Sequence, residues 1–333
     1  MTKAIALLSG GLDSTLAIKV VLEQGVEVEA INFITLFCTC SPKGGGCLIS
    51  KRVADNLGIS LQVKNVSREY LDIIKHPKYG YGKNLNPCID CRIFMFKKAA
   101  EFMKSKGASF IITGEVLGER PMSQRRDAMN IIERDAHLKG LILRPLSAKL
   151  LSPSIPEIKG WIDREKLLEI QGRSRKPQIA LAKQWDIKDY ACPAGGCLLT
   201  DSVFARRLRD LMDENMNFTL NDIHLLKIGR HLRLSKKVKA VVGRNEKENK
   251  KLMTFAEKGD LVIEKNGLPG PITILRGEAD EAIKRLAASI TAAYGKGNNL
   301  DLIEVKTNKL PEGDEDTFLV RPYKQEEIKS FLI

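Results

Sequence analysis

The sequence contains no run of ~18 apolar residues, the length that a membrane-spanning helix requires. It also lacks the signs of a secretory leader, because the opening MTKAIALLSG leads into an apolar strand pattern without a basic stretch or a small-residue cleavage site. The first absence excludes a helical membrane protein, and the second argues against secretion. We therefore expect a cytoplasmic protein that does not contact a membrane.

Histidine is scarce as well. The four histidines are His76, His137, His224 and His231, and no two of them stand at the spacing of metal ligands. The chain has no internal repeat and no low-complexity tract, which excludes a repeat array. We therefore expect neither a histidine-based metal centre nor a solenoid.

Basic residues, in contrast, outnumber acidic ones. Lys and Arg number 54 against 41 Asp and Glu, and the formal net charge is +13. A field of this sign attracts polyanions beyond the range of a single contact, so nucleic acid is the expected partner. The 333 residues, 43% of them hydrophobic, give room for about two domains of roughly 150 residues each.

The first half alternates strand patterns with helical patterns. The apolar runs typical of strands cover residues 4–8, 28–37, 61–66, 109–113 and 141–146. Helical patterns over 14–25 and 91–107 stand among them. Strands that are apolar on both faces and alternate with helices predict a doubly wound parallel α/β sheet, here over residues 1–200.

The pattern changes near residue 200. The helical patterns cover 204–215 and 279–295, and the strand patterns between them cover 237–243, 260–265 and 271–277. They predict a smaller, basic α+β domain over residues 201–333. In the first half, the stretch 148–163 contains two prolines and no clear period, so we expect a connecting or lid segment there.

The first strand pattern runs into SGGLDS, residues 9–14, and then into a helix. Strand, glycine turn and helix is a phosphate-binding arrangement, although the lysine of the GxxxxGK[ST] loop is missing. Gly10 and Gly11 allow backbone N–H groups to converge on phosphate oxygens, and the helix amino terminus adds positive charge. Asp13 is expected either to cap the helix, as Ser14 also could, or to hold Mg²⁺.

SGGxDS after the first strand resembles the signature of the PP-loop ATP pyrophosphatases, which have an adenine nucleotide alpha hydrolase-like fold. The resemblance implies that the turn binds ATP with Mg²⁺, that ATP is cleaved between its α and β phosphates, and that a substrate oxygen is adenylated. The nucleotide contacts that it implies are Ser9, Gly10, Gly11, Asp13, Ser14 and Thr15. The stretch TGEVLGERPMSQ adds Thr113 and Gly114, with Arg120 and Gln124 as candidate phosphate or RNA contacts.

The seven cysteines fall into three groups. Cys88 and Cys91 form a CxxC pair in NPCIDCR, and Cys192 and Cys197 follow in CPAGGCLLT. In a cytoplasmic protein this spacing indicates a metal or reactive-thiol site rather than disulfides, because CxxC lets two sulfurs reach one metal. The third group lies in a glycine-rich loop, where it relays sulfur, binds a second metal or stays free: Cys38, Cys40 and Cys47.

These motifs resemble those of the tRNA 2-thiouridine synthetases, in which two cysteines meet at the activated uridine. The resemblance assigns that role to Cys91 and Cys197. Cys88 stands where the best-known form carries aspartate, and three cysteines match the cluster-dependent thiolases of the same superfamily. This implies a 4Fe-4S cluster ligated by Cys88, Cys91 and Cys197, with Cys192 as a fourth ligand, a persulfide carrier or a structural thiol.

Two alternatives to the cluster remain open. Either one cysteine carries sulfur as a persulfide and the other resolves it as a disulfide, or four thiols form a structural zinc site. Asp90 stands between the two cysteines of the CxxC pair. We expect it to act as a base or to orient a uridine N–H, or else to cap the following helix.

Two basic segments are expected to bind RNA phosphates. GRSRKPQ places Arg173, Arg175 and Lys176 near the second cysteine loop. Residues 227–276 resemble the RNA-binding domain of the NFACT family. The basic cluster in this region comprises Lys227, Arg230, His231, Arg233, Lys236, Lys237, Lys239 and Arg244, of which Arg230, Arg233 and Lys237 are the expected RNA contacts.

These features predict an ATP-dependent tRNA sulfurtransferase that adenylates a uridine carbonyl and replaces its oxygen with sulfur. The expected partners are tRNA and a sulfur donor, either sulfide or a cysteine desulfurase or persulfide carrier. One rival hypothesis is a PP-loop ATPase that thiolates or amidates a small molecule. Another is a zinc-stabilised RNA-binding module without catalysis. The thiolated position and the oligomeric state are left open by the sequence.

Overall fold

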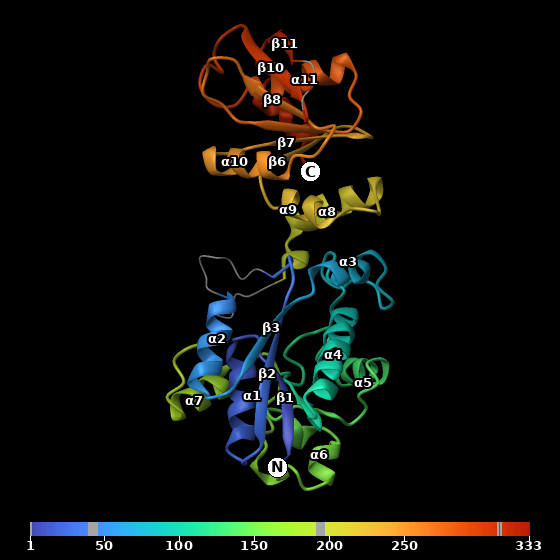
Figure 1. Ribbon diagram of the computed structural model, residues 1–333, viewed down its shortest axis with the longest axis vertical. Coiled ribbons are helices and arrows are strands. Elements are labelled where there is room, and N and C mark those ends of the chain that lie inside the picture. Colours follow the sequence, from blue (N-terminus) through green and yellow to red (C-terminus); the bar gives the residue numbers. More distant parts are fainter. Residues whose placement is uncertain (1, 39–45, 191–196, 312, 314) are drawn as a thin grey trace. The chain divides into compact units, whose positions relative to one another are not determined.

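The computed structural model describes residues 2–38, 46–190, 197–311, 313 and 315–333. The chain divides into two compact units, Met1–Thr200 and Asp201–Ile333 (Figure 1). Each unit has its own β-sheet and its own hydrophobic core. None of the helices formed by the described residues is both long enough and apolar enough to cross a bilayer.

The first unit is built on a five-stranded sheet in which all neighbouring strands are parallel. Its strands are β1 (Lys3–Leu7), β2 (Glu27–Ile34), β3 (Leu61–Asn65), β4 (Phe110–Ile112) and β5 (Ile142–Leu143). Their order is β3-β2-β1-β4-β5. The predicted doubly wound parallel sheet is thus confirmed, and each apolar run that predicts a strand contributes one.

Helices cover both faces of this sheet (Figure 1). One face carries α1 (Leu12–Leu22), α2 (Gly46–Asn56) and α7 (Lys176–Gln184), and the other carries α4 (Cys88–Ser105) and α5 (Arg126–Asp135), with α3 (Ser67–Lys75) beside α4. The alternation of side chains along β1 explains the two cores. Ala4 and Ala6 pack toward α1, whereas Ile5 packs toward α4.

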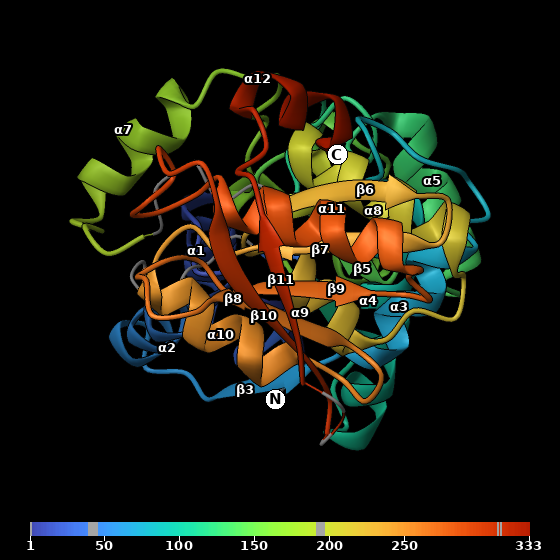
Figure 2. The same cartoon turned by 90° about the horizontal axis from the view of Figure 1, so that it is seen from above.

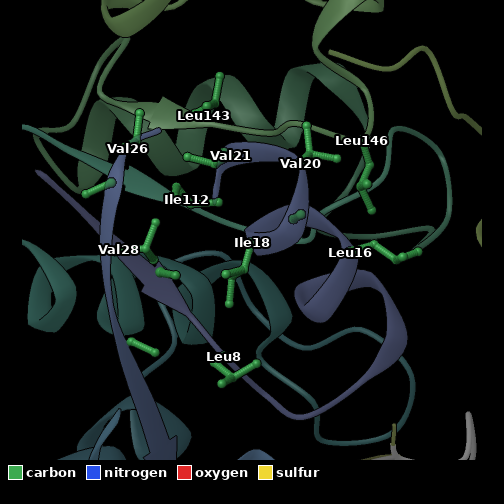
Figure 3. Packing of buried hydrophobic residues seen from close by; sticks show 14 of the residues in the cluster. Leu8, Leu16, Ile18, Val20, Val21, Val26, Val28, Ile112, Leu143 and Leu146 are labelled. Atoms are coloured by element: carbon green, nitrogen blue, oxygen red, sulfur yellow. The ribbon is translucent and has the colours of Figure 1, made fainter. Parts of the chain in front are cut away.

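The core on the α1 side is continuous and apolar. Figure 3 shows Leu16 and Val20 of α1 among side chains from the strands, including Val28 and Ile112. All four are almost completely buried. Because burial of each such side chain stabilises the fold by about 1.5–3 kcal/mol, this core fixes α1 firmly on the sheet.

The strand order places a ligand-binding edge in this unit. The order reverses between β1 and β4, which are neighbours although the chain visits β2 and β3 in between. In open parallel sheets, ligands bind outside the carboxyl ends of the strands at such a switch point. The glycine turn follows β1, and the stretch that begins at Thr113 follows β4. Both segments therefore start at the same point of the sheet edge.

Residues 148–163 form an anchored connection. Ala148 and Ile162 are buried in the core of the first unit. Between them, the short helix α6 (Ile155–Ile158) begins with a capping box formed by Ser154 and Glu157. The sequence analysis expects either a connecting segment or a lid at this stretch, and the anchored conformation is that of a connecting segment.

The second unit contains a six-stranded antiparallel sheet of order β11-β10-β8-β9-β7-β6. Its strands are β6 (Arg230–Ser235), β7 (Val238–Val242), β8 (Leu261–Lys265), β9 (Thr273–Arg276), β10 (Ile303–Lys309) and β11 (Glu315–Val320). The apolar runs predict β7, β8 and β9. The sequence analysis does not predict β6, β10 and β11, because it relies on continuous apolar runs and polar or charged residues interrupt the apolar ones in these strands.

Helices pack on both faces of the second sheet. Its helices are α8 (Ser202–Glu214), α9 (Leu220–Leu226), α10 (Glu246–Phe255), α11 (Glu281–Ala292) and the short α12 (Gln325–Ile328). Figure 2 shows α11 lying across the sheet, where Ala288 packs against Leu275 and Val305. On the other face, Leu225 of α9 and Leu252 of α10 share a second core. The predicted α+β architecture is therefore confirmed for this unit.

Candidate functional site

The glycine turn lies between β1 and α1. Gly10 has φ +78°, a left-handed conformation that favours glycine. A Cβ atom at Gly10 would lie 3.0 Å from the backbone nitrogen of Ser50, so α2 approaches the turn closely. Gly11 is the N-cap of α1, and its lack of a polar side chain leaves the helix without a side-chain cap. The N–H groups of the first turn are thus left for a ligand.

The expectation that Asp13 or Ser14 caps α1 is wrong. The helix begins at Leu12, so both residues lie inside its first turn. The Ser14 hydroxyl instead donates to the Gly11 carbonyl oxygen at 2.9 Å, and the Thr15 hydroxyl donates to the same oxygen at 3.0 Å. These bonds hold the turn in shape before a ligand arrives.

Of two further predicted contacts, Gly114 lies directly against this turn and Thr113 precedes Gly114 in the chain. Gly114 follows β4, and a Cβ atom there would lie 2.5 Å from the carbonyl carbon of Asp13. Thr113, one residue earlier, is buried and its N–H donates to the Leu143 carbonyl oxygen at 3.0 Å. The structure therefore brings residues 9–15 and 113–114 together, as the nucleotide-site prediction requires.

The Asp13 carboxylate lies near a charged side chain and is partly buried. Its Oδ2 lies 3.9 Å from Nη2 of Arg175, and its buried Oδ1 has no hydrogen-bond partner among the described residues. Burial raises the pKa of Asp13, although Arg175 and Gln178 act in the opposite direction. Burial also raises the pKa of Glu119, and the charge of Asp13 adds to that shift. An added cation such as Mg²⁺ would stabilise both carboxylates in their charged form.

Arg120 and Gln124 have different surroundings. Arg120 is exposed, whereas Gln124 is buried and its Oε1 accepts a hydrogen bond from the Arg120 N–H at 3.0 Å. Gln124 therefore braces its own loop. Of the basic residues near α7, Arg173 and Lys176 are exposed and Arg175 is half-buried beside Asp13.

The described thiols come from three distant segments. Cys88 and Cys91 lie in the first turn of α4, which has no side-chain cap. Cys38 follows β2 and forms an isolated β-bridge with Cys197, where the Leu198 N–H donates to the Phe37 carbonyl oxygen at 2.9 Å. α4 enters from the carboxyl edge of the sheet, and so all these segments gather at that edge.

One contact links the thiols to the stretch after β4. The Cys88 thiol donates to the Ser123 hydroxyl at 3.2 Å. Ser123 lies nine residues beyond Gly114, which touches the glycine turn. The same stretch therefore borders both the thiols and the turn. Cys40 and Cys192 lie outside the described residues, and of Cys47 only the backbone, at the start of α2, is described.

Burial keeps two of these thiols protonated. It raises the pKa of Cys91 to about 11 and the pKa of Cys197 to about 12, and repulsion from the other thiolates adds to both shifts. Tyr70, which is buried, is a hydrogen-bond partner of Cys91 and acts against that shift. The sequence patterns do not predict this role of Tyr70. Binding of iron or zinc here would have to displace protons, because metals bind the thiolate form.

The fit to a metal centre is incomplete. Thiols are the ligands that iron–sulfur clusters and zinc prefer. Within the described ranges, however, no group of three or more His, Cys, Asp or Glu side chains is arranged to hold a metal ion. The predicted ligands Cys88, Cys91 and Cys197 therefore share a region without forming a ready metal site.

A buried ion network supports the thiol helix. Glu115, which follows β4 and is fully buried, contacts Nε of Arg92 at 2.9 Å and Nε of Arg144 at 3.0 Å. Arg144 also pairs with Glu133 of α5. Arg92 directly follows Cys91, so the network ties the start of α4 to the end of β4. Sequence motifs do not predict this network, because its members, Arg92, Glu115, Glu133 and Arg144, are 11 to 52 residues apart.

The Asp90 carboxylate makes hydrogen bonds that its position between the two cysteines does not suggest. It is buried, and its two carboxylate oxygens accept hydrogen bonds from the N–H groups of Lys78 and Tyr79, each at 3.0 Å. Both oxygens are thus engaged with the loop before α4. This geometry supports a positioning role for Asp90 and does not support a role as a base.

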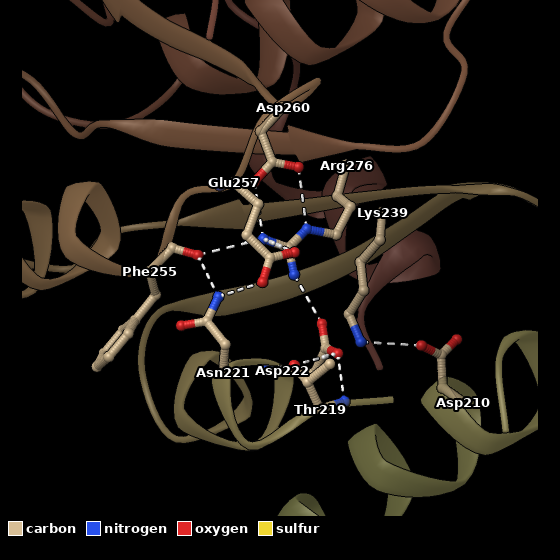
Figure 4. Close-up of polar contacts among 9 residues, drawn as sticks. All are labelled: Asp210, Thr219, Asn221, Asp222, Lys239, Phe255, Glu257, Asp260 and Arg276. Atoms are coloured by element: carbon tan, nitrogen blue, oxygen red, sulfur yellow. Dashed lines mark hydrogen bonds and ion pairs between the residues drawn. The ribbon is translucent and has the colours of Figure 1, made fainter. Parts of the chain in front are cut away.

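The basic cluster of the second unit is only partly a surface. Lys239 is buried and its ammonium contacts Asp210 at 2.9 Å (Figure 4). Arg233 contacts the same carboxylate at 2.7 Å and Glu214 at 2.6 Å. The charge of Arg233, an expected RNA contact, is therefore already neutralised within the unit.

The remaining members of the cluster differ in exposure. His231 is fully buried, and Arg230 stacks on the ring of Tyr294 with its guanidinium carbon 4.6 Å from the centroid. Lys236 and Lys237 are exposed where β6 turns into β7. Of the three RNA contacts expected in this cluster, Lys237 is thus the one whose side chain is exposed.

Two family matches accord with this geometry. Residues 1–150 match the family described as thiamine biosynthesis protein (ThiI), and residues 229–332 match the NFACT protein RNA binding domain. The second match extends the resemblance from the expected 227–276 to a range that includes all six strands of the second unit but neither α8 nor α9. The first match includes the glycine turn and the CxxC pair, and it ends before α7 and Cys197.

A curated relative and two solved structures are similar as well. The tRNA-specific 2-thiouridylase MnmA of Pseudomonas putida (strain GB-1) is 27% identical over 252 residues, which cover 69% of this chain and 60% of that protein. The chain thus spans about 60% of the length of such relatives.

A 4-thiouridine synthetase in complex with RNA and bound ATP is 20% identical, with a TM-score of 0.38 over 64% of this chain and 51% of that one. The U34-tRNA thiolase NcsA from Methanococcus maripaludis with its 4Fe-4S cluster is 17% identical, with a TM-score of 0.36 over 68% of this chain and 70% of that one. At such TM-scores neither likeness bears on function.

Proposed function

We propose that the chain is an ATP-dependent tRNA thiouridylase, because residues 1–150 match the ThiI family and residues 229–332 match the NFACT protein RNA binding domain. A uridine carbonyl oxygen attacks the α phosphate of ATP and pyrophosphate leaves. Sulfur then attacks the adenylated carbon and AMP leaves. The products are a thiouridine in tRNA, AMP and pyrophosphate.

The observation that carries the proposal is the meeting of the glycine turn and the thiols at one edge of one sheet. The stretch after β4 touches the turn through Gly114 and touches Cys88 through Ser123. The β-bridge of Cys38 with Cys197 adds a second thiol segment at that edge. A uridine bound there would reach both the nucleotide and the sulfur-bearing side chains.

The residues at the turn fit ATP. The N–H groups of the first turn of α1 are uncapped, and glycine at positions 10 and 11 leaves the backbone of the turn free of side chains that would block phosphate oxygens. Gly114 lets the stretch after β4 approach the backbone of α1. The unpartnered Oδ1 of Asp13 is suited to accept a hydrogen bond from a water molecule bound to Mg²⁺. Ser9, Ser14 and Thr15 complete the proposed nucleotide site with Thr113.

Sulfur delivery is proposed to use Cys91 and Cys197. A 4Fe-4S cluster on Cys88, Cys91 and Cys197 would supply an iron atom that carries sulfide to the activated carbon. Because the described residues present no ready metal site, we derive no step through a cluster. In the persulfide route, one thiol carries the transferable sulfur, and the other attacks the enzyme–product disulfide to release thiouridine and leave a Cys91–Cys197 disulfide for an external thiol to reduce.

The experiment combines the full chain, purified without air, with tRNA, ATP and a sulfur donor, which is sulfide for the cluster route and a cysteine desulfurase with cysteine for the persulfide route. Thiouridine is measured by mass spectrometry of the nucleosides, and pyrophosphate is measured in the same samples. We expect both products from the unmodified protein and no thiouridine from Cys91→Ser or Cys197→Ser. Both variants should still bind ATP, because neither change touches the glycine turn. Thiouridine formed at an undiminished rate by Cys197→Ser would contradict the proposal.

The same preparations separate the two sulfur routes. Iron and acid-labile sulfide that are present in the unmodified protein and lost from Cys88→Ser would support the cluster. An active, iron-free protein that accumulates a Cys91–Cys197 disulfide during turnover would support the persulfide route. A stable zinc ion with no turnover would overturn both.

A further inference from the structure

Helix α7 carries a glutamine whose polar atoms have no partner. Gln178 is 0% exposed, and neither its Nε2 nor its Oε1 has a hydrogen-bond partner among the described residues. Native proteins rarely bury an amide group in this state. An unmet donor and an unmet acceptor on one buried side chain are typical of a site that a ligand completes.

The surroundings of Gln178 are also unsatisfied. α7 packs along α1, and Gln178 lies close enough to Asp13 for its side chain to lower the pKa of that carboxyl, although neither amide atom reaches hydrogen-bond geometry. One oxygen of Asp13 and the Nε of Arg175 are buried without partners as well. Four unpartnered polar atoms from three side chains therefore gather at the amino-terminal turn of α1.

The chain that leads into α7 is fixed against the nucleotide turn. Leu117 and Gln171 form a parallel β-bridge, and the Gly172 N–H donates to the Leu117 carbonyl oxygen at 2.7 Å. A Cβ atom at Gly118 would lie 3.6 Å from the Gly172 nitrogen. The start of α7 is thus joined to the stretch that begins at Gly114, beside the turn.

We propose that Gln178 and Arg175 bind the pyrophosphate half of a magnesium-bound nucleoside triphosphate. Nε2 of Gln178 and the guanidinium of Arg175 donate hydrogen bonds to β- and γ-phosphate oxygens. Oε1 of Gln178 and Oδ1 of Asp13 accept hydrogen bonds from waters of the Mg²⁺ ion, which keeps several of its waters in proteins. The inference rests on the proposed function, because it assumes that the glycine turn holds ATP.

The proposal makes α7 the part of the site that distinguishes ATP from AMP. AMP contains neither of the phosphates that Gln178 and Arg175 contact. Once the α–β bond is cleaved and pyrophosphate leaves, the contacts to α7 are lost. ATP and pyrophosphate should therefore depend on α7, and AMP should not.

The test replaces the amide with an apolar side chain of similar length. For Gln178→Met in the full chain, we expect the Kd values of magnesium–ATP and magnesium–pyrophosphate to rise roughly tenfold or more, since hydrogen bonds to a charged group are lost. The Kd of AMP should stay unchanged. The melting temperature without ligand should stay the same or rise, because the unpartnered amide is gone. Isothermal titration calorimetry and thermal unfolding give these values.

Gln184→Met is the matched control, because Gln184 lies on the same helix and is exposed. It should leave the three Kd values and the melting temperature unchanged. Arg175→Met, at a half-buried position, provides a second variant should Gln178→Met not fold. It is likewise expected to weaken binding of pyrophosphate and ATP but not of AMP.

Two outcomes would overturn the inference. One is a lower melting temperature of Gln178→Met with unchanged affinity for pyrophosphate, which would make Gln178 a core residue only. The other is equal weakening of AMP and ATP. Because pyrophosphate binding needs neither tRNA nor thiols, a protein that binds pyrophosphate through α7 but forms no thiouridine would overturn the proposed function and leave this inference standing.

Discussion

At the scale of single residues, burial decides what a basic side chain of the second unit does. Lys239 and Lys237 are two positions apart in the sequence, yet Lys239 is buried against Asp210 and Lys237 is exposed in the turn before β7. His231 is also enclosed, with its Nε2 2.8 Å from the Ile228 carbonyl oxygen and its Nδ1 lacking a partner within the described ranges. Some residues of the basic cluster are therefore buried within the fold and do not contribute to an exposed basic surface.

The buried imidazole predicts a loss of stability in acid. Burial, reinforced by the charges of Lys239 and Arg207, holds the pKa of His231 well below its ordinary value of 6.5. Below pH 6.5 the unfolded chain binds a proton that the folded state does not bind. The free energy of unfolding should therefore fall as the pH falls, by up to about 1.4 kcal/mol per pH unit for this group. His231→Leu should flatten that dependence between pH 7 and 5.

Hydrogen–deuterium exchange of the β6 and β7 peptides in the intact chain measures this effect. His224→Leu is the control, because His224 is half-buried and its pKa is lowered less markedly. A pH dependence that persists undiminished in His231→Leu would show that other groups cause it.

At the scale of elements, Arg276 joins parts of the second unit that lie apart in sequence. It ends β9 and contacts both carboxylate oxygens of Asp260 at 2.9 and 2.7 Å (Figure 4). It also contacts Asp222 of α9 at 2.7 Å and donates to the Phe255 carbonyl oxygen at 3.2 Å. A bidentate guanidinium contact of this kind fixes geometry as well as charge.

Removing this side chain should loosen the elements that it joins. We expect Arg276→Met to lower the free energy of unfolding by about 2 kcal/mol. This loss is smaller than the loss expected for a fully buried ion pair, because 24% of the Arg276 side chain is exposed. Both tryptophans, Trp161 and Trp185, lie in the first unit. Hydrogen–deuterium exchange of peptides from 220–276 therefore reports on the second unit better than tryptophan fluorescence does.

An exposed arginine of the same unit serves for comparison. Arg209 lies on α8 and is exposed. Arg209→Met should change stability by no more than about 0.5 kcal/mol. Equal effects of the two substitutions would contradict the importance assigned to the contacts of Arg276.

At the scale of the whole molecule, the net charge of +13 predicts salt-sensitive binding of a polyanion. Phosphate contacts release counterions, so each lysine that makes one contributes close to one unit to the slope of log K against log salt. The exposed Lys236 and Lys237 are the basic-cluster residues best placed to contribute.

For tRNA binding, we expect the double variant Lys236→Ala, Lys237→Ala to reduce the salt slope by roughly 2. Lys309→Ala is the matched control: Lys309 is exposed at the end of β10, which lies on the other side of the sheet order from β6. Filter-binding measurements over a series of salt concentrations give both slopes. Equal slopes in the double variant and the unmodified protein would place the RNA contacts elsewhere.

Local patterns were enough to predict much of the first unit. SGGLDS between an apolar strand and a helix predicts a phosphate turn, and strands that alternate with helices predict a parallel sheet. Both are properties of short segments, because backbone conformation and side-chain alternation are decided by neighbouring residues. The CxxC spacing of Cys88 and Cys91 is likewise visible without coordinates.

Only the tertiary structure decided which distant residues meet. The contact of Gly114 with α1, the bridge of Cys38 with Cys197, and the unpartnered amide of Gln178 beside Asp13 all join segments that are far apart in the chain. By itself, the sequence determined the glycine turn, the strands of the first sheet and the spacing of the thiols. The folded chain decided their partners and their burial, because pairing and desolvation depend on packing between segments that no local pattern records.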